Sequence, residues 1–180
     1  MNKPLLFLTP LIIFTILIIY LASGLNRNPQ IIPNSLQGMA VPIFSLPPIK
    51  GRDNIGFKNT HLPGTVSLIN IFGSWCVACK SEHSFLMHIK AKNLIPIHGI
   101  DWRELDQLNG PRWLKIHGDP YTLVGDDPAS KTAIAFGVTG APETFLIDKK
   151  GIIQYKHIGP INKEVWDSTL WPMIQKLRQN

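Results

Sequence analysis

The sequence predicts an α/β fold in which helices flank a central mixed β-sheet, and three observations support this. Short apolar runs rich in β-branched residues, the pattern of buried strands, recur along the chain. They alternate with longer segments of helical periodicity, as is typical of a sheet that contains parallel strands. The chain then ends in a hairpin pattern followed by one more amphipathic helix. Its 180 residues leave room for one such domain and an appendage.

The appendage is the N-terminal segment. Residues 4–24 contain no charged side chain and consist largely of Leu, Ile and Phe. About 20 such residues in a helix span the roughly 30 Å hydrocarbon core of a bilayer. A cleavable signal peptide is the alternative, although its apolar region normally has only about 7 to 15 residues. We therefore expect an uncleaved membrane anchor over residues 1–25, a polar linker over 26–38 and a folded domain over 39–180.

The first half of this domain contains two buried strands and an edge strand. Residues 41–48 contain three prolines, which cannot donate to a central ladder, so this segment is expected at a sheet edge. Residues 66–72 form an apolar run too short for an ordinary helix and predict a buried strand. A second buried strand is expected over 94–101. Between them, Phe85, Leu86 and Ile89 lie on one face of a helix.

The second half contributes further helices, a third strand and the hairpin. Its expected elements are a helix over 105–117 weakened by Gly110 and Pro111, a strand over 121–124, a polar turn over 125–128, a short helix over 131–136 stopped by Gly137, hairpin strands over 144–147 and 152–157 with their turn at 148–151, and a final helix from the capping residue Asn162 to Leu177.

A pair of cysteines stands at the point where the strand pattern changes to a helical one. The motif is Trp75-Cys76-Val77-Ala78-Cys79, with Ser74 as the candidate N-cap. Cys76 would lie in the first turn, where free N–H groups and the helix dipole stabilise a thiolate, the form that attacks disulfides. Cys79 lies one turn further on the same face, near enough to close a ring with Cys76. The pair is predicted to be a dithiol that forms a redox disulfide.

A zinc site is the alternative interpretation of this spacing, with His83 and His88 as further ligands. All four side chains would then lie on one helix, which cannot surround a tetrahedral ion. We therefore expect no metal. The chain has only two cysteines, so a stabilising disulfide framework is excluded.

The net charge of +6 does not indicate nucleic-acid binding. The basic residues are scattered and form no run or stripe interleaved with aromatic residues. A mildly basic solvated surface explains the charge, and no nucleic-acid partner is expected.

The second informative stretch, Gly137-Val138-Thr139-Gly140-Ala141-Pro142-Glu143-Thr144-Phe145, resembles the thioredoxin superfamily. In that superfamily a cis-proline before a strand faces the CxxC motif. The resemblance implies a cis bond at Pro142 and a backbone at Ala141 that pairs with an extended substrate strand.

More narrowly, the chain resembles the membrane-tethered thiol reductases of cytochrome c maturation, the CcmG or DsbE family. The likeness covers most of residues 39–172, and its sharpest mark is the acidic residue directly after the proline. Thr139 stands where an aromatic residue is common in the family, and Trp102-Arg103-Glu104 replaces a more usual Tyr-Lys-Asp.

The resemblance implies a set of site residues. Cys76 is expected to attack the substrate disulfide and Cys79 to resolve the mixed disulfide, while Glu82 and Glu143 supply acidity around the thiols. Glu82, three residues after Cys79, is also expected to take the proton of Cys79. Together with Pro142 these residues form the expected catalytic set. The expected substrate-binding residues are Trp75, Thr139 and Ala141.

The resemblance also implies partners and a location. The substrate would be apocytochrome c, or a haem-lyase component joined to it, and a membrane thiol-transfer reductase would return the pair to the dithiol form. The protein would be a single-pass protein of the inner membrane with its catalytic domain in the periplasm, and would need no cofactor. The alternatives are a general extracytoplasmic disulfide oxidoreductase, a thioredoxin-fold copper metallochaperone, and a binding module that only holds apocytochrome.

Overall fold

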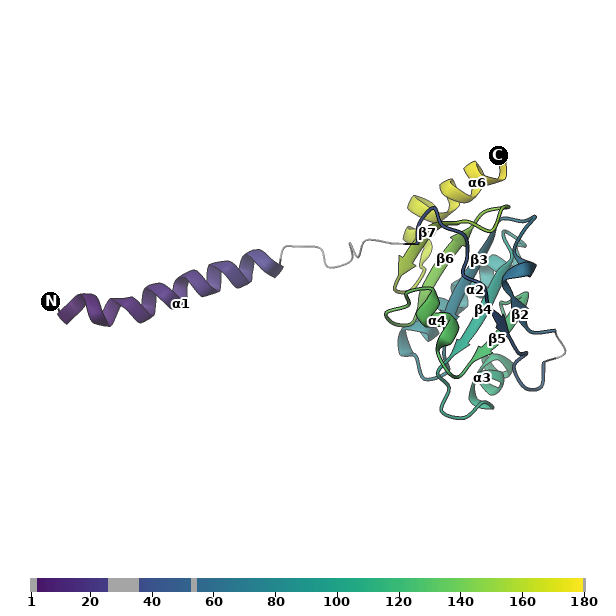
Figure 1. Cartoon of the computed structure of the whole chain (residues 1–180), viewed down its shortest axis with the longest axis horizontal. Helices are drawn as coiled ribbons and strands as arrows, with labels where there is room; N and C mark the ends of the chain where they lie inside the picture. Colours follow the sequence, from purple (N-terminus) through teal and green to yellow (C-terminus); the bar gives the residue numbers. More distant parts are fainter. Residues whose placement is uncertain (1–2, 26–35, 53–54, 180) are drawn as a thin grey trace. The chain divides into compact units, whose positions relative to one another are not determined.

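The computed structural model describes residues 3–25, 36–52 and 55–179, which belong to two units, Met1–Pro33 and Asn34–Asn180. In the first unit, α1 (Lys3–Leu25) is a helix with Pro10 inside it, and its described side chains, at residues 9–22, are exposed (Figure 1). Among the described residues, no helix is both long and apolar enough to cross a membrane, so the predicted anchor is not confirmed. Most of the predicted linker, residues 26–35, lies outside the described residues.

The second unit is built on a five-stranded mixed sheet with the strand order β5-β4-β3-β6-β7. The pairs β3–β4 and β4–β5 are parallel, whereas β6 runs antiparallel to both β3 and β7. The mixed sheet predicted from the sequence is therefore confirmed. The strands are β3 (Ser67–Phe72), β4 (Ile97–Trp102), β5 (Leu123–Asp127), β6 (Glu143–Ile147) and β7 (Ile153–Ile158).

Every residue of the central strand β3 is buried, because both faces of the sheet are covered. The two faces carry separate apolar cores, since successive side chains of a strand point to opposite faces. Leu68 and Phe72 pack on one face with α2 (Val77–Ala91), while Ile69 and Ile71 pack on the other with Phe136, which follows α4 (Lys131–Ala135). Figure 1 shows α4 in front of the sheet and α2 behind it.

The remaining elements surround this sheet. The final helix begins after Asn162, whose Oδ1 accepts the N–H of Val165 at 2.9 Å, as the sequence predicts. The other elements are β1 (Ser45–Leu46), β2 (Phe57–Lys58), the 3₁₀ turn η1 (Asn59–His61), α3 (Asn109–His117), α5 (Lys163–Val165), the π-helical turn η2 (Trp166–Leu170) and α6 (Trp171–Gln179).

Three predicted segments differ from the structure. Residues 125–127 of the polar turn expected at 125–128 are instead the end of β5, because Gly125 packs against Leu46 and the N–H of Asp126 donates to the carbonyl of Pro47 at 2.9 Å. Helix α3 begins at Asn109 and not at residue 105, which leaves Pro111 in the first turn, where its missing N–H costs no helical hydrogen bond. The proline-containing edge segment contributes only the two-residue β1, which pairs with β2.

Candidate active site

The two cysteines form a disulfide at the start of α2, with their Cα atoms 5.2 Å apart. Cys76 is itself the N-cap, and its Sγ accepts the backbone N–H of Cys79 at 3.0 Å. The expectation that Ser74 caps this helix is wrong, since the N–H and the hydroxyl of Ser74 both donate to the carboxylate of Glu104. Cys76 is 6% exposed and Cys79 only 1%. The N-terminal sulfur is therefore the more accessible one, and a backbone donor is in place to stabilise its thiolate.

The loop before β6 lies opposite the disulfide. The Ala141–Pro142 peptide bond is cis, as expected from the sequence. The carbonyl oxygen of Ala141 lies 3.3 Å from the Sγ of Cys76. The fold therefore brings together two motifs that are 65 residues apart in sequence.

Apolar side chains border the accessible sulfur. The indole of Trp75 is 46% exposed, and its Nε1 donates to the carbonyl oxygen of Trp102 at 3.0 Å. A side chain on Gly73 would come within 2.5 Å of the Trp75 indole, so this placement requires glycine there. Val77 is exposed as well. A client chain that reaches Cys76 would thus meet exposed apolar surface on this side.

Glu82 lies on the same face of α2 as Cys79 and is only 1% exposed. Its Oε1 accepts the Nδ2 hydrogen of Asn70 at 2.8 Å, and its Oε2 accepts the N–H of Ile161 at 2.8 Å. Asn70 is itself held by the hydroxyl of Tyr121, which donates to its Oδ1 at 2.7 Å. Burial raises the pKa of Glu82 from 4.5 to about 7, although the hydrogen bonds from Ile161 and Asn70 act in the opposite direction. A carboxyl group with this pKa can accept or release a proton near neutrality.

Glu143 lies elsewhere. Its side chain is fully buried, and its Oε1 accepts hydrogen bonds from the N–H of Thr139 at 2.8 Å, the hydroxyl of Thr139 at 2.6 Å and the N–H of Gly140 at 3.2 Å. Its Oε2 forms an ion pair with Nζ of Lys156 at 2.8 Å. The neighbouring Thr144 bonds to Asn70 on the α2 face of the sheet, so Glu143 points to the opposite face.

This geometry differs from the expectation that both glutamates supply acidity around the thiols. Glu143 is neutralised by Lys156 and supports the loop that carries Ala141 and Pro142, and Glu82 alone lies on the cysteine side of the sheet. Thr139 is likewise tied to Glu143 through both its backbone and its hydroxyl.

Sequence reasoning missed several polar residues that support this site. They are Asn70, Tyr121 and Lys156, together with Asp101 and Glu104, whose contacts are described below. The amide Asn70 within a mostly apolar strand was a usable signal, because a buried amide needs partners. The other four carry no local pattern.

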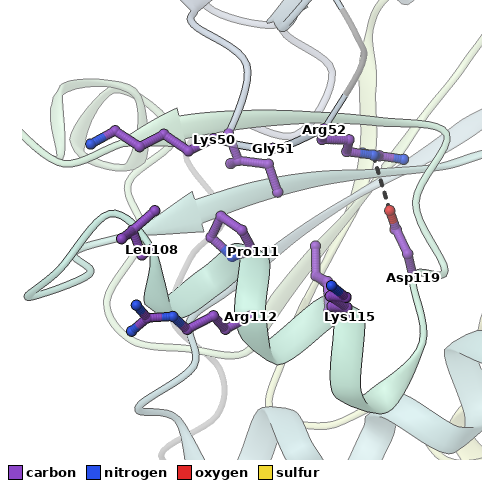
Figure 2. A pocket seen from close by; sticks show the side chains of 10 residues that line it. Lys50, Gly51, Arg52, Leu108, Pro111, Arg112, Lys115 and Asp119 are labelled. Atoms are coloured by element: carbon purple, nitrogen blue, oxygen red, sulfur yellow. Dashed lines mark ion pairs between the residues drawn. The ribbon is translucent and has the colours of Figure 1, made fainter.

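A cavity of about 360 Å³ lies beside α3 and contains none of the predicted site residues (Figure 2). Its lining includes the basic residues Lys50, Arg52, Arg112 and Lys115, and Arg52 forms an ion pair with Asp119 at 3.0 Å. The redox centre therefore does not lie in this cavity. Among the described residues, no group of three or more His, Cys, Asp or Glu side chains is placed to hold a metal ion.

Comparison with known proteins places this arrangement in a class. The chain matches the Redoxin family over residues 36–170, which identifies it as a thioredoxin-like redox protein. The thiol:disulfide interchange protein DsbE of Allochromatium vinosum is 39% identical over 169 residues, which are 94% of this chain and 92% of that protein. DsbE of Pseudomonas aeruginosa is 35% identical over 175 residues, or 97% and 96% of the two chains.

The chain belongs to the DsbE family of thiol:disulfide interchange proteins, and it is a thiol:disulfide oxidoreductase with Cys76 and Cys79 as its redox pair. The solved structure of a DsbE-type protein from Chlorobium tepidum has the same fold, with a TM-score of 0.66 at 23% identity over 78% of this chain and 96% of that one. The resemblance predicted from the sequence is confirmed.

Proposed function

We propose that this protein is a reductant in cytochrome c maturation that keeps the two thiols of the apocytochrome c CxxCH motif free for haem attachment. The observation that carries the proposal is the arrangement of the pair: Cys76 is the more accessible sulfur beside the Ala141 carbonyl, and Glu82 is buried on the Cys79 side. This order suits attack by the first cysteine and resolution by the second.

The reaction starts from the dithiol form. The Cys76 thiolate attacks one sulfur of the client disulfide, the client S–S bond breaks, and a new S–S bond joins Cys76 to the client. The other client sulfur leaves as a thiolate and takes up a proton. The N–H of Cys79, which lies 3.0 Å from Sγ of Cys76, stabilises the attacking thiolate before this step.

Resolution follows at Cys79. Its thiol gives up a proton to Glu82, and the resulting thiolate attacks Sγ of Cys76. The bond between Cys76 and the client breaks, and the client leaves with both sulfurs reduced. The client has gained two electrons, and the protein is left with the Cys76–Cys79 disulfide that the structure shows. Because the pKa of Glu82 is about 7, it can receive the proton of Cys79 at neutral pH.

The proposal includes a place for the protein and a source of electrons. A membrane thiol-transfer reductase returns the disulfide to the dithiol form by the same exchange chemistry. Residues 4–24, which carry no charge, anchor the chain in the inner membrane and hold the catalytic domain in the periplasm. Extraction of the full chain from membranes by detergent but not by alkaline carbonate would support the anchor, whereas release by carbonate would contradict it.

A trapping experiment tests the function. The Cys79→Ser variant should accumulate a mixed disulfide through Cys76 with an oxidised apocytochrome c peptide containing CxxCH, whereas Cys76→Ser should not. An oxidised peptide of the same length without the haem-binding histidine serves as the matched client. Preferential trapping of the CxxCH peptide supports the proposal. Equal trapping of both peptides supports a general oxidoreductase, and absence of any adduct with Cys76 contradicts the mechanism.

A further inference from the structure

Another buried carboxyl group, that of Asp101, lies near the end of β4. Asp101 is only 1% exposed, and its Oδ1 has no hydrogen-bond donor among the described residues. Its Oδ2 packs against Gly110 in the first turn of α3, where a Cβ atom would lie 1.8 Å from it. Any other residue at position 110 would displace the carboxyl group, so the chain encloses Asp101 closely.

Glu104 lies within hydrogen-bonding reach of the Asp101 carboxyl. The other ionisable group that acts on Asp101 is Asp126 on β5, and neither Glu104 nor Asp126 is a cation. The pKa of Asp101 is raised to about 8, mainly by burial and next by Glu104. Asp101 therefore keeps its proton at neutral pH and can donate it to the neighbouring carboxyl group of Glu104.

The far side of Glu104 binds the turn that presents the redox pair. Its Oε1 accepts the N–H of Ser74 and its Oε2 accepts the hydroxyl of Ser74 at 2.7 Å. The same turn is closed by the N–H of Cys76, which donates to the carbonyl of Gly73 at 3.0 Å. Glu104 therefore links the carboxyl group of Asp101 to the backbone two residues before the nucleophile.

We infer that Asp101 and Glu104 share one proton and act as a positioning pair that holds the Ser74 turn, and with it Cys76, in the arrangement needed for thiol–disulfide exchange. With the shared proton in place, Glu104 accepts from Ser74 on one side and from Asp101 on the other. Without it, two adjacent anions repel each other in a buried site, and the carboxylate of Glu104 moves away from Asp101 and takes the turn with it.

The pair has a signature that thiolate chemistry alone does not produce. The rate at which Cys76 attacks a small disulfide rises with pH as the thiolate forms. Loss of the shared proton opposes that rise. If the proton leaves with a midpoint near pH 8 and the released turn is inactive, the rate per thiolate falls about tenfold between about pH 7 and pH 9.

The test is the pH profile of the single-turnover reaction between the reduced protein and a small aromatic disulfide, with the thiolate fraction measured by its ultraviolet absorbance. The wild-type protein should show the alkaline fall in rate per thiolate. Asp101→Asn, which donates permanently to Glu104, should lose it, and Asp106→Asn, an exposed residue of the same loop, should keep it. An Asp101→Asn profile identical to the wild type would overturn the inference.

A second measurement uses the unchanged chain, so it remains decisive if Asp101→Asn folds poorly. Infrared spectra of the wild-type protein at neutral pH should contain a protonated carboxylic acid band that titrates near pH 8 and persists in Glu82→Gln. Absence of that band would equally overturn the inference. Because both measurements use the protein alone or a small disulfide, they do not depend on whether apocytochrome c is the client.

Discussion

The buried carboxyl group of Glu82 makes stability depend on pH, and Glu82→Gln isolates the effect. The pKa of Glu82 is raised from 4.5 to about 7 in the folded protein. A raised folded-state pKa gives a stabilising contribution that is complete below the unfolded pKa and is lost as the pH rises through the folded one. Proton linkage across this pKa shift means that Glu82 lowers the free energy of unfolding by about 1 kcal/mol at pH 5 and by about 3 kcal/mol at pH 7, relative to a side chain that stays protonated. Glu82 should therefore remove about 2 kcal/mol of stability between about pH 5 and pH 7.

The assay is urea unfolding of the oxidised protein at pH values from 5 to 7, with wild type and variants compared at each pH. The amide that replaces the carboxyl group cannot ionise, so the free energy of unfolding of Glu82→Gln relative to wild type should rise by about 2 kcal/mol over this range. At pH 5 the free energy of unfolding of Glu82→Gln can be about 1 kcal/mol below that of the wild type, because the amide cannot accept hydrogen bonds from both Asn70 and Ile161. Glu164→Gln, on an exposed helix position, is the control. A constant difference between Glu82→Gln and wild type across this range would refute the reasoning.

Three further substitutions follow from the packing. Lys156→Met leaves the carboxylate of Glu143 buried without its ion pair, and should lower the free energy of unfolding by about 3–5 kcal/mol. Adding Glu143→Gln should restore much of this loss. A smaller loss in the single variant than in the double variant would contradict this. Asn162→Ala removes the cap of the C-terminal helix and should cost about 1 kcal/mol by chemical denaturation, whereas no loss would mean that the cap is replaced. Leu86→Ala creates a cavity beneath α2 and should cost about 2–5 kcal/mol without changing the alkaline pH profile of exchange, and a cost below about 1 kcal/mol would indicate that the core collapses around it.

The parts of the fold that could be predicted from sequence are those whose signal is local. The run at 66–72 is mostly apolar because β3 is covered on both faces, and this composition predicts a buried strand. The end of β5 was not recognised, because Gly125, Asp126 and Asp127 are turn residues by composition. Their place in a strand depends on contacts that are remote in sequence: the N–H of Asp126 donates to the carbonyl of Pro47, and the carboxylate of Asp127 accepts the N–H of Ala133.

The same division applies to the site. The cysteine spacing and the segment around Pro142 are short motifs, and the structure brings them together at the Cys76–Ala141 contact. The role of Glu143 could not be predicted, because the direction in which its side chain points depends on the register of β6 against β3, where Glu143 lies opposite Ile71. A shift of one residue in that register would have pointed it toward α2. Asp101 and Glu104 come within hydrogen-bonding reach across Arg103, which has a φ of 55°, and no periodic pattern reveals such a contact.

The charge distribution around the redox pair follows from which face of the sheet each carboxyl group occupies. On the face of α4, the Glu143 carboxylate is balanced by Lys156 and adds little field at the sulfurs. The carboxyl groups of Glu82 and Asp101 form no such ion pair among the described residues. Burial, and after it these two carboxyl groups, raises the pKa of Tyr121, whose hydroxyl donates to Asn70. Each carboxyl group instead avoids a buried negative charge by keeping its proton toward neutral or alkaline pH. A second anion near Cys76 would oppose formation of its thiolate, so the retained protons leave the backbone donor at the start of α2 as the dominant influence on the attacking sulfur.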